Sequence, residues 1–433
     1  MFISSAYYLD DPSLETGRVR ILAVGEKEKY DDSLYCRSHN QTVEAVFRPI
    51  GHNDHCQWRI YFLDCEFASR TGRLELYNLI NDQTVRVRVS QPAKTKHNVV
   101  VCFNQANLLE NWQLAMHVVE MYRNLGADLL VLPVLNMITE LFEVLEQYEQ
   151  DGLIRIVKGV VLPAVKDLNY DPNEELENVG RLLAANECLY DNKHTAKYII
   201  FSDLDELLLP KNGDYFDEFT RIRSLHLKVS SFEFNWGISA APAQSANSYD
   251  VTRPLKDVMV REVVGFGTPV VIPQKVDAAF EHSPMNAMSS PRHLRLSRTD
   301  SWSIKFIFPV YNAALKNLTI PLNFSPRIGF YFSIMDEFNQ RLNQNRGLYN
   351  KFKSLPSQLS FGPKIEPCLR IQKLRSVPYT CINQRNCLPA IANTSRRCTV
   401  LKRTFHVSSF GAGRYLYSSL RTEFSRHHSC VVY

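Results

Sequence analysis

The sequence lacks several features that would assign it to a specialised class of protein. Residues 1–30 contain no apolar run near the ~20 residues that a membrane helix needs, and no signal-peptide core. No Cys-x-x-Cys pair occurs, so the cysteines do not have zinc-site spacing. There is no basic stripe with interleaved aromatic residues, which argues against nucleic acid as a partner. Because repeats and low-complexity tracts are also absent, we expect an ordinary globular fold.

The bulk composition agrees with a globular protein. The chain has 433 residues, of which 45% are hydrophobic and 22% are charged, and its net charge is +5. This length is enough for one large domain or two. The mildly basic balance suits an anionic sugar nucleotide or an acidic membrane surface as a partner.

The ten cysteines indicate an oxidising compartment. Seven of them fall into two groups in which we predict disulfides, with the connectivity left open: Cys36, Cys56 and Cys65 in one group, and Cys368, Cys381, Cys387 and Cys398 in the other. Cys102 lies in an apolar strand and Cys188 in a predicted helix, and both are interpreted as buried free thiols.

Four Asn-x-Ser/Thr sequons also favour a lumenal or extracellular location, at Asn40, Asn317, Asn323 and Asn393. A lumenal protein needs a signal or an anchor, and residues 1–30 show neither. Either the chain is cytosolic, or this sequence lacks a natural N-terminal membrane anchor, and we favour the missing anchor.

The most informative stretch is an acidic cluster that directly follows an apolar strand. Residues 197–202 predict a central strand of a parallel sheet, and Asp203-Leu204-Asp205-Glu206 comes immediately after it. Ligands bind at the carboxyl ends of such strands, and carboxylates there suit a divalent cation that carries a diphosphate. In an extended segment Asp203 and Asp205 would face the same ion. The alternative is a solvated turn, although the apolar run Leu207–Pro210 makes a surface turn unusual.

The strand and helix pattern predicts three segments. Residues 1–95 form short strands of a small antiparallel β module, with expected strands at 19–24, 42–47, 57–63, 73–79 and 84–89. Residues 96–330 alternate strand and helix, which gives a parallel sheet, and the acidic cluster follows its fourth strand. Asn107 is expected to cap the first helix, with Glu110 completing a capping box. Residues 331–433 form a helical and Cys-rich extension packed on the domain of residues 96–330, with a polar helix at 333–353 outside the core.

An α/β domain whose fourth strand ends in Asp-x-Asp resembles the GT-A fold of nucleotide-sugar glycosyltransferases. Five motifs in the right order make the chain similar to glycosyltransferase family 92, especially its nematode branch. These motifs are Glu110-Asn111-Trp112, Val119-Glu120, Leu125-Gly126-Ala127-Asp128, Tyr148-Glu149-Gln150-Asp151-Gly152 and Phe201-Ser202-Asp203-Leu204-Asp205-Glu206. The resemblance is good over about residues 98–285.

The resemblance implies a Golgi type II membrane protein that transfers galactose from UDP-galactose to a glycan, with inversion and with Mn²⁺ or Mg²⁺. It makes Asp203 and Asp205 the metal and donor ligands, and Glu206 the acidic residue that follows them. His282, at the end of the segment 271–282, corresponds to a third metal ligand, and a His ligand favours Mn²⁺. The alternative for His282 is a surface or core histidine.

The catalytic base is not identified by the sequence. Asp300 and Glu233 are two suggestions, with Trp302 as a sugar-stacking platform, and each has a structural alternative as a solvated turn or an edge-strand residue. The chain also departs from the family at residues 103–106, where a Pro and an aromatic residue are common.

Two other functions stay open at this stage. A non-catalytic family member would act as a glycan-binding protein. A nucleotidyltransferase could also use a metal-bound Asp pair, but it should have a Gly-rich basic loop after its first strand, and residues 103–107 contain neither Gly nor Lys.

Overall fold

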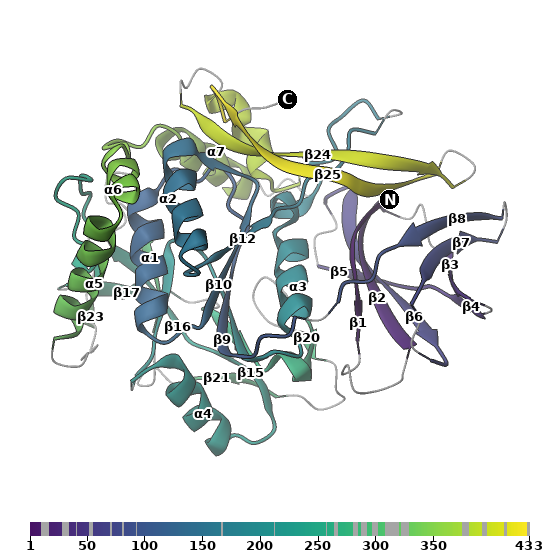
Figure 1. The fold of residues 1–433 in the computed structure, drawn as a ribbon, viewed down its shortest axis with the longest axis horizontal. Helices are drawn as coiled ribbons and strands as arrows, with labels where there is room; N and C mark the ends of the chain where they lie inside the picture. Colours follow the sequence, from purple (N-terminus) through teal and green to yellow (C-terminus); the bar gives the residue numbers. More distant parts are fainter. Residues whose placement is uncertain are drawn as a thin grey trace.

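The computed structural model combines antiparallel sheets near the N-terminus, a central sheet between helices, and a long C-terminal hairpin (Figure 1). It describes residues 1–9, 17–27, 34–39, 41–51, 55–69, 72–79, 82–91, 93–165, 168–211, 213–256, 258–263, 267–279, 285–286, 292–296, 302–307, 320–321, 329–374, 381–391, 396–410 and 414–430. All four sequon asparagines lie outside these ranges. Among the described residues, no helix is long and apolar enough to cross a membrane.

The first eight strands pair antiparallel in two sheets. Their bounds are β1 Phe2–Tyr8, β2 Gly17–Glu26, β3 Leu34–Ser38, β4 Gln41–Glu44, β5 Val46–Ile50, β6 Trp58–Phe67, β7 Leu74–Asn78 and β8 Gln83–Val87. Alternate side chains of both sheets meet in one apolar cluster. The prediction of a single strand at 42–47 is wrong, because Ala45 separates two strands, β4 and β5, that belong to different sheets.

The central sheet has seven strands in the order β12-β10-β9-β13-β18-β15-β21. Their bounds are β9 His97–Phe103, β10 Leu129–Val134, β12 Arg155–Lys158, β13 Ala196–Ser202, β15 Val229–Glu233, β18 Pro269–Val271 and β21 Arg292–Arg295. Neighbouring strands are parallel except where β18 pairs with β13 and β15. The predicted α/β class with a mainly parallel central sheet is confirmed.

This strand order creates a switch point between β9 and β13. From β9 the chain moves to β10 on one side, and it later returns to β13 on the other side. Crossovers that leave in opposite directions open a crevice at the carboxyl ends of the two strands, where open α/β sheets bind their ligands.

Helices cover both faces of the sheet, as the alternation of apolar side chains requires. They are α1 Trp112–Asn124, α2 Thr139–Gln150, α3 Arg181–Asn192 and α4 Tyr215–Leu225. Val99 and Val101 of β9 pack in the same cluster as α1 and α2, whereas Val100 and Cys102 pack in a second cluster with α3.

The predicted capping box at the start of α1 is wrong. Asn111, not Asn107, caps the helix, and its side chain accepts from the Leu114 amide at 3.3 Å. Ala106 and Leu109 form β-bridges to residues 134 and 137, so the preceding segment is held extended and the helix begins later. The Glu110 carboxylate instead accepts backbone amides of residues 360 and 361.

A second sheet and several short elements complete the domain. They are β11 Asn136–Ile138, β14 Glu206–Leu209, β16 Asn235–Ala240, β17 Met259–Glu262, β19 Val276–Ala278, β20 Met285–Asn286, β22 Trp302–Ile307 and β23 Ile320–Pro321. The five-stranded sheet has the order β14-β22-β16-β17-β23. A tight turn connects the two sheets, because it joins the end of β13 in the central sheet to the start of β14 in the second sheet.

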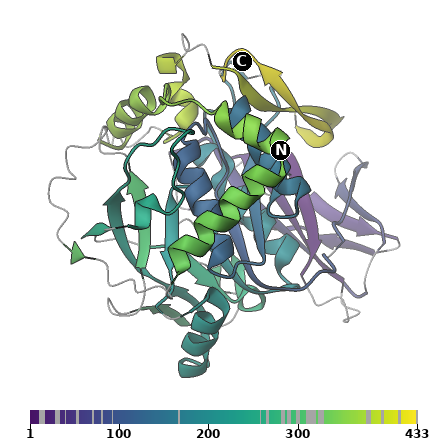
Figure 2. The same ribbon diagram turned by 60° about the vertical axis from the view of Figure 1, so that its left-hand side comes forward.

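The C-terminal helices are part of the main core. They are α5 Phe330–Gln344, α6 Arg346–Lys353 and α7 Gly362–Leu374. Figure 2 shows α5 and α6 lying across α1 and α2. Ile334, Phe338, Leu348 and Phe352 are almost fully buried in the main cluster, so the expectation that residues 333–353 lie outside the core is wrong. One apolar stripe on an otherwise polar helix is enough for this burial.

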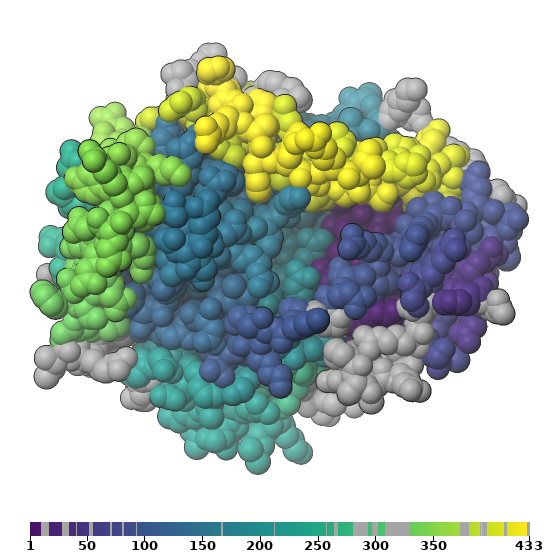
Figure 3. Space-filling model, viewed as in Figure 1, coloured from purple at the N-terminus to yellow at the C-terminus, as the bar shows by residue number. Residues whose placement is uncertain are grey.

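The last two strands extend the first sheet. β24 Cys398–Ser409 and β25 Tyr415–His427 form a hairpin that pairs with β1 on one side and with β11 on the other. The hairpin surface therefore runs across both the central domain and the N-terminal strands (Figure 3). The two ends of the chain share one sheet.

Five disulfides account for all ten cysteines: Cys36–Cys65, Cys56–Cys381, Cys102–Cys188, Cys368–Cys387 and Cys398–Cys430. Disulfides in the two predicted groups are confirmed, since Cys36–Cys65 and Cys368–Cys387 each lie within one group. Cys56–Cys381 joins the two groups, and Cys398 pairs with Cys430, which belongs to neither. The interpretation of Cys102 and Cys188 as free thiols is wrong, because β9 and α3 pack face to face and bring the two sulfurs together.

Candidate functional site

The Asp-x-Asp segment forms a tight turn at the switch point. β13 ends at Ser202, β14 begins at Glu206, and the Glu206 amide donates to the Asp203 carbonyl at 3.1 Å. The Ser202 hydroxyl donates to the Glu206 carbonyl at 3.0 Å and accepts from the Tyr122 hydroxyl at 2.8 Å. The expected extended geometry is therefore wrong: a turn, braced from α1, presents the two aspartates.

Asp203 is the most strongly held carboxylate of the site. Its Oδ1 atom accepts from Asn104 Nδ2 at 2.6 Å and from the Arg181 guanidinium at 3.0 Å. Asn104 directly follows β9, so this bond links the carboxyl ends of the paired strands β9 and β13. Burial alone would raise the pKa of Asp203, but the cations of Arg181 and Lys305 outweigh it and hold this pKa well below its usual range.

Asp205 shares one cation with Asp203. Lys305 Nζ lies 3.1 Å from Asp205 Oδ1 and 3.5 Å from Asp203 Oδ2. Burial and the Asp203 charge raise the pKa of Asp205, and Lys305 opposes them. The Asp205 side chain is 36% exposed, so water moderates this effect and the carboxylate stays open to a ligand.

Glu206 faces the second sheet. Its carboxylate accepts from the Ser303 hydroxyl on β22. Burial and the nearby Asp203 charge raise the pKa of Glu206. The third acidic residue of the motif thus anchors the turn to β22.

Lys305 and Arg181 are site residues that the sequence reasoning missed. Lys305 reaches the turn because β22 pairs antiparallel with β14, which sets Lys305 opposite Glu206. Arg181 is the first residue of α3, and this helix begins at the carboxyl edge of the sheet. The only local signals were a lysine alternating within an apolar strand and an arginine directly after a glycine, and neither identifies a partner.

An unusual turn delivers Arg181 to the site. Asn178, Val179 and Gly180 all have left-handed backbone angles, with φ of 44°, 56° and 80°. Such angles are unfavourable for a β-branched residue such as Val179. Gln105, just after β9, stabilises the turn by donating to the Val179 carbonyl at 2.9 Å.

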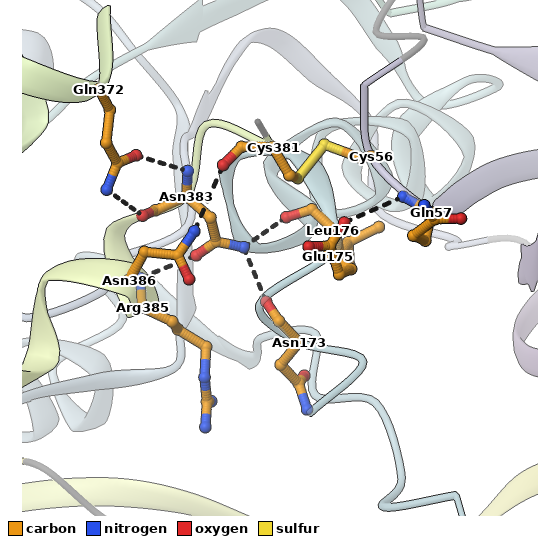
Figure 4. The surroundings of a disulfide bond; sticks show 10 residues. All are labelled: Cys56, Gln57, Asn173, Glu175, Leu176, Gln372, Cys381, Asn383, Arg385 and Asn386. Carbon is orange, nitrogen blue, oxygen red and sulfur yellow. Dashed lines mark hydrogen bonds between the residues drawn. A yellow bond between two sulfur atoms is a disulfide. The ribbon is translucent and has the colours of Figure 1, made fainter. Parts of the chain in front are cut away.

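The C-terminal extension clamps the segment that precedes this turn (Figure 4). Asn383 Nδ2 donates to the carbonyls of Asn173 and Leu176 at 2.7 and 2.6 Å. The Cys56–Cys381 disulfide ties the same region to the N-terminal strands. Residues remote in sequence therefore fix the entry to α3 and the position of Arg181.

The other suggested site residues are not brought to the aspartates among the described residues. His282 and Asp300 lie outside those residues. The Glu233 side chain is only 2% exposed. Its carboxylate accepts from the Gly267 amide at 2.9 Å and lies 3.1 Å from His293 Nε2. Trp302 is half-buried, with its ring against Gly237.

Asp203 and Asp205 are the residues at the turn that could hold a divalent cation. Within the described ranges, no cluster of three or more His, Cys, Asp or Glu residues could hold a metal ion. The carboxylates of Asp203 and Asp205 nevertheless both contact one cation, Lys305 Nζ, so both can reach the same ion. Carboxylate oxygens are the ligands that Mg²⁺ and Mn²⁺ prefer, so the pair suits such an ion.

A buried histidine beneath the site makes stability depend on pH. His117 of α1 is fully buried, packs edge-on against Phe306 at 5.1 Å between ring centroids, and donates from Nδ1 to the Val251 carbonyl at 2.5 Å. Burial lowers the pKa of His117 to about 4, although the Val251 bond and the Asp250 charge oppose it. The unfolded chain therefore binds one more proton between pH 6.5 and 4.

We expect this difference to cost about 3 kcal/mol of folding stability as the pH falls from 7 to 4. His117→Asn, which keeps an amide donor near Nδ1, should flatten that part of the pH profile in urea unfolding. His406→Asn on exposed β24 is the matched control and should keep the wild-type slope. Equal slopes for wild type and His117→Asn would show that His117 does not contribute.

Comparison with known proteins agrees with these observations. The family described as glycosyltransferase family 92 matches residues 97–321. Three Caenorhabditis elegans proteins, each described as a glycosyltransferase family 92 protein, are similar to this chain. One is 25% identical over 403 residues, covering 85% of this chain and 75% of that protein. The second is 24% identical over 264 residues, covering 59% and 51%, and the third is 24% identical over 297 residues, covering 66% and 58%.

The chain thus spans between about half and three quarters of these relatives. Among solved structures, HddC from Yersinia pseudotuberculosis is 9% identical with a TM-score of 0.26, and the match covers 56% of this chain and 99% of that chain. A structural similarity of this size does not establish a shared fold or function.

Proposed function

The chain belongs to glycosyltransferase family 92, and from this we propose that it transfers galactose from UDP-galactose to a glycan acceptor, with inversion at the anomeric carbon. Family membership supports glycosyl transfer, with a nucleotide-sugar donor and a glycan acceptor. The family resemblance of the Asp-x-Asp segment supports galactose, the inverting course and Mn²⁺. The switch point in the mainly parallel sheet supports a GT-A arrangement.

One observation carries the proposal. Asp203 and Asp205 lie at the carboxyl ends of β9 and β13 and share one cation, Lys305 Nζ, at 3.5 and 3.1 Å. Two carboxylates that converge on a cation at this edge of the sheet are suited to a metal-bound diphosphate. Asp203 and Asp205 would hold Mn²⁺ or Mg²⁺, which when bound would neutralise the leaving diphosphate.

The remaining charged residues would bind and orient the donor. The turn carries three carboxylates, and Arg181 and Lys305 supply two cations. A guanidinium at the start of α3 adds to the partial positive charge of the helix N-terminus, a combination that suits phosphate oxygens. Asn104 would keep Asp203 oriented towards the crevice.

We also propose that the protein works in the secretory pathway, in the Golgi lumen. Five disulfides support an oxidising compartment.

A second function has one observation in its favour. Arg181 and Lys305 already neutralise Asp203 and Asp205, as would suit a non-catalytic member that binds glycans. Such a protein would bind sugars without releasing UDP from any donor.

A donor screen separates the two functions. Purified protein with Mn²⁺ and mixed glycan acceptors should release UDP from UDP-galactose faster than from UDP-glucose or UDP-N-acetylhexosamines. Chelation of the metal should abolish this release. No UDP release from any donor, together with glycan binding, would reject the enzyme and support the second function.

A further inference from the structure

Lys305 occupies the place between the two aspartates that a divalent cation would take. Its Nζ atom lies 3.1 Å from Asp205 Oδ1 and 3.5 Å from Asp203 Oδ2. Asn104 and Arg181 both use the other oxygen of Asp203, Oδ1. The oxygens that face Lys305 are therefore the ones left for a metal ion.

The main chain of Lys305 is fixed by strand pairing, whereas its side chain is partly exposed. Antiparallel pairing with β14 and parallel pairing with β16 hold its backbone in the middle of β22. The side chain is 30% exposed and ends in a compact ammonium on a flexible four-carbon stem. It can leave the aspartates without any movement of the sheet.

An ammonium and a divalent ion cannot both lie between these carboxylates at contact distance. The two cations would repel each other strongly at such a separation. When the pair holds a divalent ion, Lys305 must turn away, and the new anion nearby is the diphosphate of the donor.

We propose that Lys305 is a resident counter-cation, which competes with the divalent ion for Asp203 and Asp205 and turns to the donor diphosphate when it is displaced. This inference rests on the proposed function, because it needs a metal and a nucleotide diphosphate at the turn. It assigns Lys305 two successive anionic partners, whereas Arg181 keeps its bond to Asp203 Oδ1 throughout.

Calorimetry on Lys305→Met tests both halves of the proposal. Without nucleotide, Mn²⁺ should bind about tenfold more tightly than to wild type, because its competitor is gone. With saturating Mn²⁺, UDP should bind about tenfold more weakly, because a charge-assisted contact is lost. Lys305→Arg should keep the wild-type Mn²⁺ affinity. Lys256→Met, which removes an exposed lysine paired with Asp250 at 2.6 Å, is the matched control and should change neither affinity.

A measurement on wild type covers the case in which Lys305→Met fails to fold. Acetylation of lysines, read by peptide mass spectrometry, should modify Lys305 more readily with Mn²⁺ than without it, relative to Lys256. The proposed competition between Lys305 and Mn²⁺ would be overturned by acetylation of Lys305 that does not change with Mn²⁺. It would also be overturned if Lys305→Met bound Mn²⁺ no more tightly than wild type.

The outcomes also separate this inference from the function on which it rests. If wild type binds neither Mn²⁺ nor UDP, the proposed function fails together with the role of Lys305. If wild type binds both and Lys305→Met binds Mn²⁺ no more tightly, only the role of Lys305 fails.

Discussion

Replacing Asp205 by alanine is expected to reduce Mn²⁺-dependent UDP binding at least about 100-fold while the protein stays folded. Loss of a residue that merely orients a metal ligand already costs about 10–100-fold, so loss of a ligand should cost more. The fold should tolerate the change, because the Asp205 side chain is 36% exposed and its ionised form is disfavoured by burial and by Asp203.

Isothermal calorimetry with UDP, with and without Mn²⁺, measures this effect, and thermal unfolding without ligands reports on the fold. Asp336→Ala on α5 is the matched control, because it removes an exposed aspartate elsewhere in the domain. Unchanged Mn²⁺-dependent UDP affinity in Asp205→Ala would remove the turn as the metal site. Loss of UDP affinity together with a much lower melting temperature would indicate that Asp205 has a structural role instead.

Arg341→Met is expected to lower the free energy of unfolding by about 3–5 kcal/mol. Arg341 of α5 forms an ion pair with Glu120 of α1, and the Tyr148 hydroxyl of α2 donates to the same carboxylate at 2.5 Å. The Glu120 side chain is fully buried, whereas Arg341 is 16% exposed. Removing the arginine would leave Arg123, at 3.7 Å, as the only cation that the described residues place near the buried Glu120 carboxylate, in a site that water cannot reach.

Urea unfolding of the variant measures this loss. Arg421→Met on β25 removes an ion pair with Glu423 in which both side chains are well exposed, at 73% and 49%, and it should cost no more than about 1 kcal/mol. The double variant Glu120→Gln with Arg341→Met should lose less stability than Arg341→Met alone, since no charge is left buried. If Arg341→Met and Arg421→Met cost the same, the buried pair does not hold α5 to the core.

The strongest sequence prediction was the place of the acidic cluster, directly after a buried strand. An apolar run over residues 197–202 had to be a buried strand, and the aspartates directly after it had to lie at the strand's carboxyl end. The turn could not be predicted to be tight, because its shape depends on Tyr122 and Ser303, which reach it from other elements.

Local patterns were also misleading where distant segments compete for the same groups. Asn107 and Glu110 match a capping box, but bridges from Ala106 and Leu109 keep the chain extended there. Cys102 and Cys188 looked like isolated thiols, because their strand and helix are 86 residues apart in sequence. Neither outcome follows from spacing, since both depend on which surfaces meet.

The sequence by itself determined the alternation of strand and helix over residues 97–202, the class of the central sheet and the place of Asp203 and Asp205 at its edge. Backbone hydrogen bonding and side-chain periodicity are local, so a single strand or helix carries its own signal. Only the tertiary structure decided which cations meet these aspartates. Asn104, Arg181 and Lys305 come from positions 99, 22 and 100 residues away from the aspartates they contact. Strand pairing and helix packing bring them together, and a linear pattern does not encode those contacts.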